Sequence, residues 1–325
     1  MKAYVYRRYG GPDVVELADV PDPVPKDDEV LVKVLATTVT AADWRVRTLS
    51  MPKGFGPVAR LAIGVTRPRQ PIMGTELAGV VEAVGSRVTR FKPGDAVVAF
   101  PGGKMGCHAQ FRTVAEDGPI APKPERLTFE EAASLSFGGT TALHFLRKAA
   151  LAPGERVLVV GASGNVGTAI VQLAKHEGAR VTGVTSTRNL DLVRSLGADD
   201  VVDYRKEDWL ARENAFDVVA DTVGEVPFSR SKRVLAGNGR HLAVAGGLSD
   251  TLASARKREG GKRVIAGPAP ERAEDVREVM ALAERGVLRP VIDRVYAWEE
   301  MREAHAHVES RRKRGSVVVR VRHDA

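Results

Sequence analysis

The sequence predicts an α/β protein in which a β-rich barrel or sandwich is followed by a doubly wound parallel sheet. Three observations support this prediction. Up to about residue 120, short β-branched runs alternate with Gly and Pro, which is typical of an all-β unit. From residue 156 onward, apolar strands alternate with helical patterns, which indicates a parallel sheet. A glycine-rich turn joins the first strand and the first helix of that alternation.

Length and composition limit the class of protein. At about 100 to 200 residues per domain, 325 residues suggest two domains. With 43% hydrophobic and 28% charged residues, disordered and collagen-like chains are excluded. The longest stretch without a charged side chain, 157–174, contains three glycines and does not resemble a membrane span. No secretory signal is visible, and the single Cys107 excludes an internal disulfide, so we expect a cytoplasmic protein.

The net charge of +8 leaves several classes of partner open. It is compatible with nucleic acid, anionic lipid or a phosphorylated cofactor. The densest basic run, Arg311–Arg314, is short, and we expect a solvated face or a local anion contact there. Only 5% of the residues are aromatic, and no Phe/Tyr pair interleaves with the basic residues, so nucleic acid is not the expected partner.

In chain order, the first predicted elements are strands at 2–6, 14–20, 29–39, 79–84 and 95–100. Pro21, Pro23 and Pro25 exclude a helix between the second and the third of these strands. Residues 45–70 are basic, poorly periodic and broken by Gly and Pro, which predicts a surface excursion.

The middle and the tail of the chain alternate strands with helices. Thr128 and Glu131 form a capping box that opens a helix. Further helices, predicted at 165–177 and 189–196, end before Gly178 and Gly197. The remaining predicted elements are strands at 156–160, 180–184, 216–220 and 241–245, helices at 271–285 and 299–309, and a final strand at 316–321.

The turn after residue 160 has the spacing of a dinucleotide-binding fingerprint. Small residues stand at Ala162, Gly164 and Gly167. Gly164 lets the backbone approach a pyrophosphate, and Gly167 permits close packing of the helix on the sheet. The helix N-terminus then offers free N–H groups to the anion. We therefore predict a bound dinucleotide; the alternative is a purely structural glycine turn.

The end of the second parallel strand indicates which dinucleotide binds. An NAD site has Asp or Glu there, whereas this chain has Thr185, Ser186, Thr187 and Arg188. Hydroxyls and a guanidinium suit a 2′-phosphate, and no carboxylate repels it. Asp191 lies further on, inside the next helix. These residues predict NADP(H); the alternative is that Ser186 and Thr187 only cap the helix.

Six further stretches complete the pattern: 71–85 (PIMGTELAGVVEAVG), 91–97 (FKPGDAV), 139–142 (GTTA), 185–198 (TSTRNLDLVRSLGA), 203–204 and 288–293 (LRPVID). Together with the turn they resemble the medium-chain dehydrogenase/reductase superfamily, in its zinc-independent quinone oxidoreductase-like branch. The resemblance covers essentially the whole chain. It implies a GroES-like β-barrel domain of residues 1–124 and 269–325, a Rossmann domain of residues 125–268, an active site between them, and a homodimer.

The resemblance also implies roles for residues by position. The cofactor contacts fall on Thr141, on the pyrophosphate turn of Ser163, Gly164, Asn165 and Val166, on Ser186 and Arg188 for the 2′-phosphate, and on Tyr204 beside the adenosine. The loop of Gly246 and Gly247 is expected to border the nicotinamide. The alternatives are that Thr141 only caps a helix and that Tyr204 is half-buried packing.

Two positions depart from the family pattern. Thr40 stands where Asn is frequent, and Ser316 stands where Lys commonly follows the glycine of the terminal strand. The positions of zinc ligands hold Thr40, Ala41 and Thr75, and zinc catalysis needs about three protein ligands, so no metal is expected. Cys107 is expected to be a packed thiol, because nothing in the sequence pairs it with a base.

These expectations lead to one hypothesis and two alternatives. We expect a zinc-independent, NADPH-dependent reductase that transfers a hydride to a quinone or an α,β-unsaturated carbonyl. Thr40 or Thr141 is expected to contact the nicotinamide amide or the developing enolate, and residues 50–70, with Phe55 and Ile63, to cover the substrate. The alternatives are a metal-free alcohol or aldehyde oxidoreductase, and a non-catalytic nucleotide-sensing or nucleic-acid-binding homologue.

Overall fold

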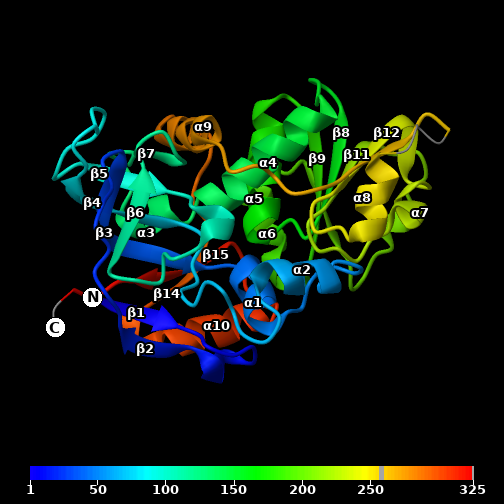
Figure 1. The fold of residues 1–325 in the computed structure, drawn as a ribbon. Coiled ribbons are helices and arrows are strands. Elements are labelled where there is room, and N and C mark those ends of the chain that lie inside the picture. The colour runs from blue at the N-terminus through cyan, green and yellow to red at the C-terminus, as the bar shows by residue number, and fades with distance from the viewer. Residues whose placement is uncertain (256–259, 324–325) are drawn as a thin grey trace.

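The structure is a computed structural model that describes residues 1–255 and 260–323, and its strands form two large sheets and a short hairpin (Figure 1). The hairpin pairs β1 (Lys2–Val5) with β2 (Glu16–Asp19) in antiparallel fashion. The first large sheet contains β3 (Glu29–Val39), β4 (Leu77–Val84), β5 (Ala96–Ala99), β6 (Phe111–Ala115), β7 (Ile120–Pro122), β14 (Ile292–Tyr296) and β15 (Ser316–Arg320).

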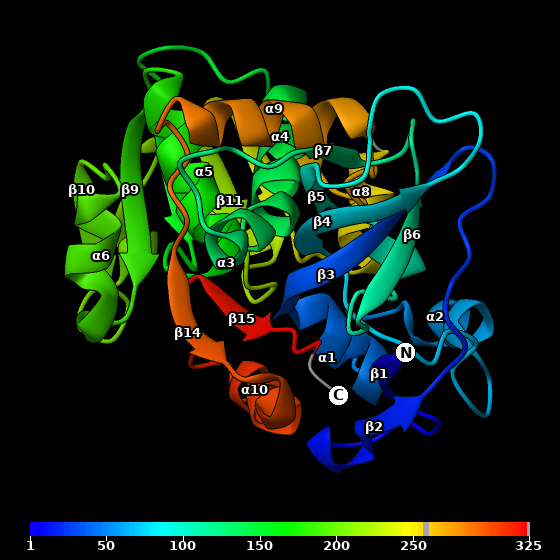
Figure 2. The ribbon, with the colours of Figure 1, turned by 90° about the vertical axis from the view of Figure 1, so that its left-hand side faces the viewer.

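The first sheet brings together strands from both ends of the chain. Its order is β14-β15-β3-β4-β5-β7, and β6 also pairs with β3. Figure 2 shows β15 beside β3, to which it is antiparallel. Along β3, Val30, Val32 and Val34 are fully buried and alternate with partly exposed residues, which is the two-residue period of a half-buried strand.

The second sheet is parallel throughout and confirms the doubly wound prediction. It contains β8 (Arg156–Val160), β9 (Arg180–Thr185), β10 (Asp200–Asp203), β11 (Phe216–Asp221), β12 (Leu235–Ala243) and β13 (Arg263–Ile265). Its order is β10-β9-β8-β11-β12-β13. From β8 the chain adds β9 and β10 on one side, and then β11, β12 and β13 on the other. The carboxyl ends of β8 and β11 therefore border the crevice where such sheets bind ligands.

The helices connect and cover these sheets. They are α1 (Ala41–Thr48), α2 (Gly56–Ile63), α3 (Phe129–Ala133), α4 (Ser136–Ala149), α5 (Asn165–His176), α6 (Leu190–Ser195), α7 (Phe228–Ser231), α8 (Leu248–Ser254), α9 (Ala273–Glu284) and α10 (Met301–Glu309). Figure 1 shows α4 and α5 together near the centre of the molecule, and they pack against each other. The domain boundaries given above stay a prediction; their ranges include residues 256–259 and 324–325, which lie outside the described residues.

Most predicted elements are present within a few residues of their expected bounds. Residues 45–70 lie mostly at the surface, as expected, but they contain helical segments that the sequence did not predict. This segment contains the second half of α1 and all of α2. Thr40 caps α1 through a box whose acid is Asp43 instead of the usual Glu or Gln, so the signal is weak in the sequence. Gly56 and Pro57 suggest a turn, yet Pro is well tolerated at the first position of a helix. The short strands β6, β7, β10, β13 and β14 were not predicted, because short strands depend on their neighbours.

In the described part of the chain, two large hydrophobic clusters form most of the core, and two smaller ones accompany them. One large cluster lies between the parallel sheet and the layer of α4, α5 and α9, and the other fills the barrel. Among the described residues, none of the helices combines the length and the apolar character that crossing a bilayer requires.

We expect a buried histidine in the second sheet to make the stability of the fold sensitive to acid. His241 on β12 is fully buried, both ring nitrogens have no partner among the described residues, and burial lowers its pKa to about 4. The unfolded chain takes up this proton near pH 6.5 and the folded chain does not, so stability is complete above that pH and is lost as pH falls towards 4. At pH 5 the loss is about 2 kcal/mol.

Thermal melting at pH 7.5 and pH 5 tests this expectation. His241→Leu should reduce the difference between the two melting temperatures, whereas the same replacement at the exposed His176 is the control for the loss of an imidazole. An unchanged pH difference in His241→Leu would show that this imidazole does not contribute.

Candidate active site

The glycine turn between β8 and α5 has two different steric requirements. Gly161 has a φ of +79°, a conformation that L side chains rarely adopt. A Cβ on Gly167 would lie 2.2 Å from the carbonyl oxygen of Gly161, because α5 starts directly against the turn. At Gly164 the nearest atom to such a Cβ is 3.4 Å away, so its side faces free space. The turn is therefore tightly packed at Gly167 and open at Gly164, as the fingerprint predicts.

The N-terminus of α5 is available to an anion. Gly164 is its N-cap and supplies no side-chain acceptor to the first turn. The aligned peptide dipoles and free N–H groups of such an end favour a phosphate. The side-chain amide of Asn165 is engaged with the first sheet, because Nδ2 donates to Ser316 Oγ on β15 at 2.7 Å. Val166 packs against the core of the parallel sheet.

Hydroxyls of the turn and of β9 form one hydrogen-bonded cluster. Thr185 Oγ1 donates to Ser163 Oγ at 2.9 Å. Asn189 Nδ2 donates to Ser163 Oγ at 3.0 Å and to Ser186 Oγ at 3.3 Å. The structure thus brings Ser163 and Ser186 together through Asn189, a residue that the sequence analysis did not single out as a site residue. Its position three residues after Ser186 was the available signal.

The end of β9 has the features expected of a 2′-phosphate site. Arg188 is exposed, and its guanidinium donates to the carbonyl oxygen of Arg312. Asp191 lies in α6 and pairs with Arg194 at 2.9 Å, away from a ribose position. Asp203 accepts from the hydroxyl of Thr187, which helps to lower the pKa of that carboxyl.

Tyr204 follows β10 and lies beside the end of β9. Its backbone N–H donates to the carbonyl oxygen of Thr185 at 3.2 Å. Tyr204 is 55% exposed, so part of its ring is open to a ligand, and both the adenine contact and half-buried packing stay predictions. An exposed phenol ring at this edge suits a flat adenine, and the guanidinium of Arg205 stands 5.9 Å from the centre of its ring.

The loop after β12 contacts the excursion of residues 45–70 at Lys53. Gly247 is the N-cap of α8, and its N–H donates to Asp250 Oδ2 at 2.9 Å. The N–H of Leu248 donates to the carbonyl oxygen of Lys53 at 2.9 Å, and a Cβ on Gly247 would lie 2.6 Å from that oxygen. Gly246 precedes this contact and donates to the carbonyl oxygen of Ala243. The excursion therefore covers the carboxyl edge of the parallel sheet at β12.

Thr40 and Thr141 each donate a hydrogen bond within or next to their own helix. The hydroxyl of Thr40 donates to Asp43 Oδ2 at 2.6 Å, and Asp43 Oδ1 accepts from the N–H of Gly74 at 2.8 Å. The hydroxyl of Thr141 donates to the carbonyl oxygen of Phe137 at 2.7 Å. A hydroxyl has one proton and two lone pairs, so in this arrangement both side chains are left as acceptors. Thr141 lies inside α4, which excludes the helix-cap alternative.

Glu76 is the site residue whose role the sequence did not reveal. It is fully buried, and it accepts from the hydroxyl of Thr38 and from the N–H of Phe137, both at 2.7 Å. Burial raises its pKa to about 7. Glu76 therefore ties β3 to the first turn of α4, the helix that bears Thr141. Its place in the Gly74-Thr75-Glu76 motif was the only signal.

No metal centre is evident among the described residues. Within 1–255 and 260–323, no group of three or more His, Cys, Asp or Glu side chains could hold a metal ion. Cys107 is a buried free thiol, and burial raises its pKa, which makes it a poor nucleophile. Thr75 is also buried, and its hydroxyl has no partner in the described part of the chain.

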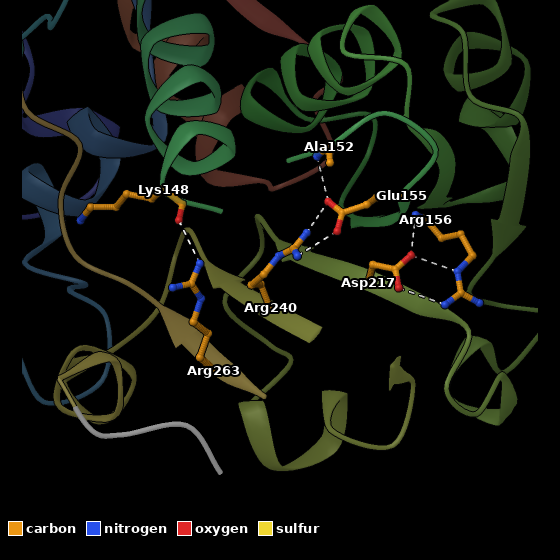
Figure 3. Close-up of polar contacts among 7 residues, drawn as sticks. All are labelled: Lys148, Ala152, Glu155, Arg156, Asp217, Arg240 and Arg263. Atoms are coloured by element: carbon orange, nitrogen blue, oxygen red, sulfur yellow. Dashed lines mark hydrogen bonds and ion pairs between the residues drawn. The ribbon is translucent and has the colours of Figure 1, made fainter. Parts of the chain in front are cut away.

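Two arginine–carboxylate ion pairs lie near the amino ends of the parallel strands (Figure 3). Arg156 on β8 donates to both carboxylate oxygens of Asp217, each at 3.0 Å. Arg240 on β12 donates to both oxygens of Glu155, at 2.9 and 2.5 Å. Carboxylates already hold these two guanidinium groups, whereas sheets of this topology bind ligands at the opposite, carboxyl edge.

Two known families match successive parts of the chain. Residues 26–125 match the alcohol dehydrogenase GroES-like domain, and residues 196–319 match a family described as zinc-binding dehydrogenase. The first match covers the strands β3 to β7 of the barrel, and the second includes the later strands of the parallel sheet. The molecule accordingly combines a GroES-like domain with a Rossmann-type parallel sheet.

Individual relatives extend the match to nearly the whole chain. A 2-methylene-furan-3-one reductase of Solanum lycopersicum is 32% identical over 98% of this chain and 79% of its own. An NADPH-dependent alkenal/one oxidoreductase of Arabidopsis thaliana is 31% identical over the same shares. A quinone oxidoreductase structure from Coxiella burnetii superposes with a TM-score of 0.84, at 28% identity and 99% coverage of both chains. The chain belongs to the medium-chain dehydrogenase/reductase superfamily.

Proposed function

We propose that the protein is an NADPH-dependent oxidoreductase that transfers a hydride to a quinone or an α,β-unsaturated carbonyl. One observation supports this best: the open glycine turn before α5 lies beside a β9 end that offers Ser186 and Arg188, while the nearby carboxylate of Asp203 accepts from Thr187. The names of the reductase and quinone oxidoreductase relatives point to the same substrates.

The residues at the carboxyl edge fit the proposed cofactor. The N–H groups of the first turn of α5 would hold its diphosphate, Ser186 and Arg188 its 2′-phosphate, and Tyr204 its adenine. The loop of Gly246 and Gly247 would border the nicotinamide. When bound, NADPH supplies the hydride, and the protein orients the reacting carbon and excludes water.

Thr40 and Thr141 are proposed to border the reacting atoms. Because their protons are donated to Asp43 and to Phe137, both hydroxyls would accept hydrogen bonds from the nicotinamide amide. The proton that completes the reduction would then come from water.

We also propose that the reaction needs no zinc. Thr40, Ala41 and Thr75 stand at the ligand positions of zinc-dependent relatives, and hydroxyl and methyl groups are not zinc ligands of choice. Without a Lewis acid, a conjugated acceptor is the easier substrate, because its negative charge spreads through an enolate or a hydroquinone.

The test is turnover of NADPH with a panel of quinones and enones after exhaustive chelation. Reduction of at least one conjugated acceptor should persist, metal analysis should find no stoichiometric zinc, and ethanol should be oxidised slowly or not at all. Chelator-sensitive activity, or faster oxidation of simple alcohols, would contradict the proposal. Cofactor binding without turnover across the panel would favour a nucleotide-sensing homologue.

For the assembly we propose a homodimer, as the family resemblance suggests, and for the location the cytoplasm, which suits the single free thiol of Cys107. Light scattering of the purified protein should give twice the chain mass of 34.9 kDa, and a monomer would contradict the assembly.

A further inference from the structure

The segment before β15 crosses the glycine turn. Gly315 and Gly164 form a parallel β-bridge, and the N–H of Gly315 donates to the carbonyl oxygen of Ser163 at 2.7 Å. Arg188 donates to the carbonyl oxygen of Arg312 in the same segment. A part of the chain that belongs to the first sheet thus lies directly against the proposed phosphate site.

Lys313 places an ammonium group at this crossing. Its Nζ donates to the carbonyl oxygen of Gly315 at 2.6 Å, so the charge lies beside the residue that bridges Gly164. The N-terminus of α5, which begins at the next residue, already bears the positive end of the helix dipole. The ammonium thus adds a second positive charge beside the turn, and both charges favour an anion there.

The carboxylates near Lys313 are engaged elsewhere. Asp293 of β14 pairs with His307 at 3.0 Å and with Arg314 at 3.2 Å. Glu76, before β4, accepts from Thr38 and Phe137. Among the described residues, Lys313 forms no ion pair with a carboxylate, and burial lowers its pKa to about 8 although Asp293 and Glu76 act in the opposite sense.

Ser316 is uncharged, and its hydroxyl is already engaged, since it donates to the carbonyl oxygen of Ser134 at 3.0 Å and accepts from Asn165. We propose that Lys313 binds the diphosphate of the cofactor, as a positioning residue that the GroES-like part of the chain contributes to the nucleotide site. The inference rests on the proposed function. In this arrangement Lys313 makes part of the basic run Arg311–Arg314 an anion contact, so that the run is not purely a solvated face.

Calorimetric binding of small nucleotides to the full-length protein tests the proposal. ADP has a diphosphate and no 2′-phosphate, whereas adenosine 2′-monophosphate has the reverse. Lys313→Met should weaken ADP, NADH and NADPH by about 10-fold to 100-fold, the effect of one hydrogen bond to a charged group, and leave adenosine 2′-monophosphate unchanged.

Arg314→Met is the matched control. It removes one positive charge from the neighbouring position, but that guanidinium is held by Asp293, so ADP affinity should stay at the wild-type value. Unchanged ADP binding in Lys313→Met, or an equal loss of ADP and adenosine 2′-monophosphate, would overturn the inference. If the wild-type protein binds none of these nucleotides, the proposed function fails with it.

A pH profile decides the matter if Lys313→Met does not fold. Wild-type affinity for ADP should fall above about pH 8 as the ammonium loses its proton, whereas Lys313→Arg should keep its affinity up to pH 9.5, because a guanidinium stays charged. Parallel profiles of the two proteins would contradict a role for this ammonium.

Discussion

Replacing Gly167 with Ala is expected to abolish nucleotide binding and to destabilise the fold. The added Cβ would lie 2.2 Å from the carbonyl oxygen of Gly161 and 2.9 Å from the Cα of Ala162. Both are backbone atoms, so α5 or the turn must move. Such overpacking costs about 1–3 kcal/mol, and occasionally more. Thermal melting without ligand and titration of NADPH fluorescence measure the two effects.

Gly164→Ala is the matched control, because it adds the same methyl group to the same turn. Its Cβ would meet only the Gly161 carbonyl oxygen, at 3.4 Å, and its φ of −79° suits any residue. We expect an unchanged melting temperature and a weaker affinity for NADPH, since the methyl group occupies the side from which the phosphate approaches. Equal melting temperatures for the two variants would contradict the distinction between a packing glycine and a binding glycine.

Arg188→Ala is expected to weaken NADPH by about 10-fold to 100-fold and to leave NADH nearly unchanged. One hydrogen bond to a charged group contributes about 1.5–3 kcal/mol, which corresponds to that range. The Arg188 guanidinium already lies at the end of β9, where it donates to the Arg312 carbonyl oxygen. Fluorescence titration of both cofactors gives the two affinities.

Arg194→Ala controls for the loss of a positive charge near this site. Arg194 lies in α6 and pairs with Asp191, so its removal should change neither affinity. If the wild-type protein binds NADPH and NADH equally, the assignment of a 2′-phosphate site at Ser186 and Arg188 is wrong.

Local sequence signals predicted most of the fold. The β-branched run 29–39 coincides with β3, and the capping box of Thr128 and Glu131 opens α3 as expected. These elements were predictable because their signals lie within a few residues of one another. The helices α1 and α2 were not predicted, because α1 depends on a weaker box and α2 begins at Gly56-Pro57.

The candidate site was predictable only where its residues lie close together in the sequence. The turn and the end of β9 are continuous stretches, so Gly164, Ser186 and Arg188 could be chosen directly. The contact of Glu76 with Thr38 and Phe137, in contrast, joins three distant segments through tertiary packing. The position of Lys313 beside the turn depends likewise on the pairing of β15 with β3 and on the bridge at Gly315.

The most direct test of the proposed hydride transfer is to follow the label from NADPH that is deuterated at C4 of the nicotinamide. With an enone as acceptor and a chelator present, we expect deuterium at the β-carbon of the product from only one of the two C4 epimers. One face of the nicotinamide alone would then face the substrate. Oxidation of NADPH without deuterium in the product, or transfer from both epimers alike, would contradict hydride transfer in an ordered site.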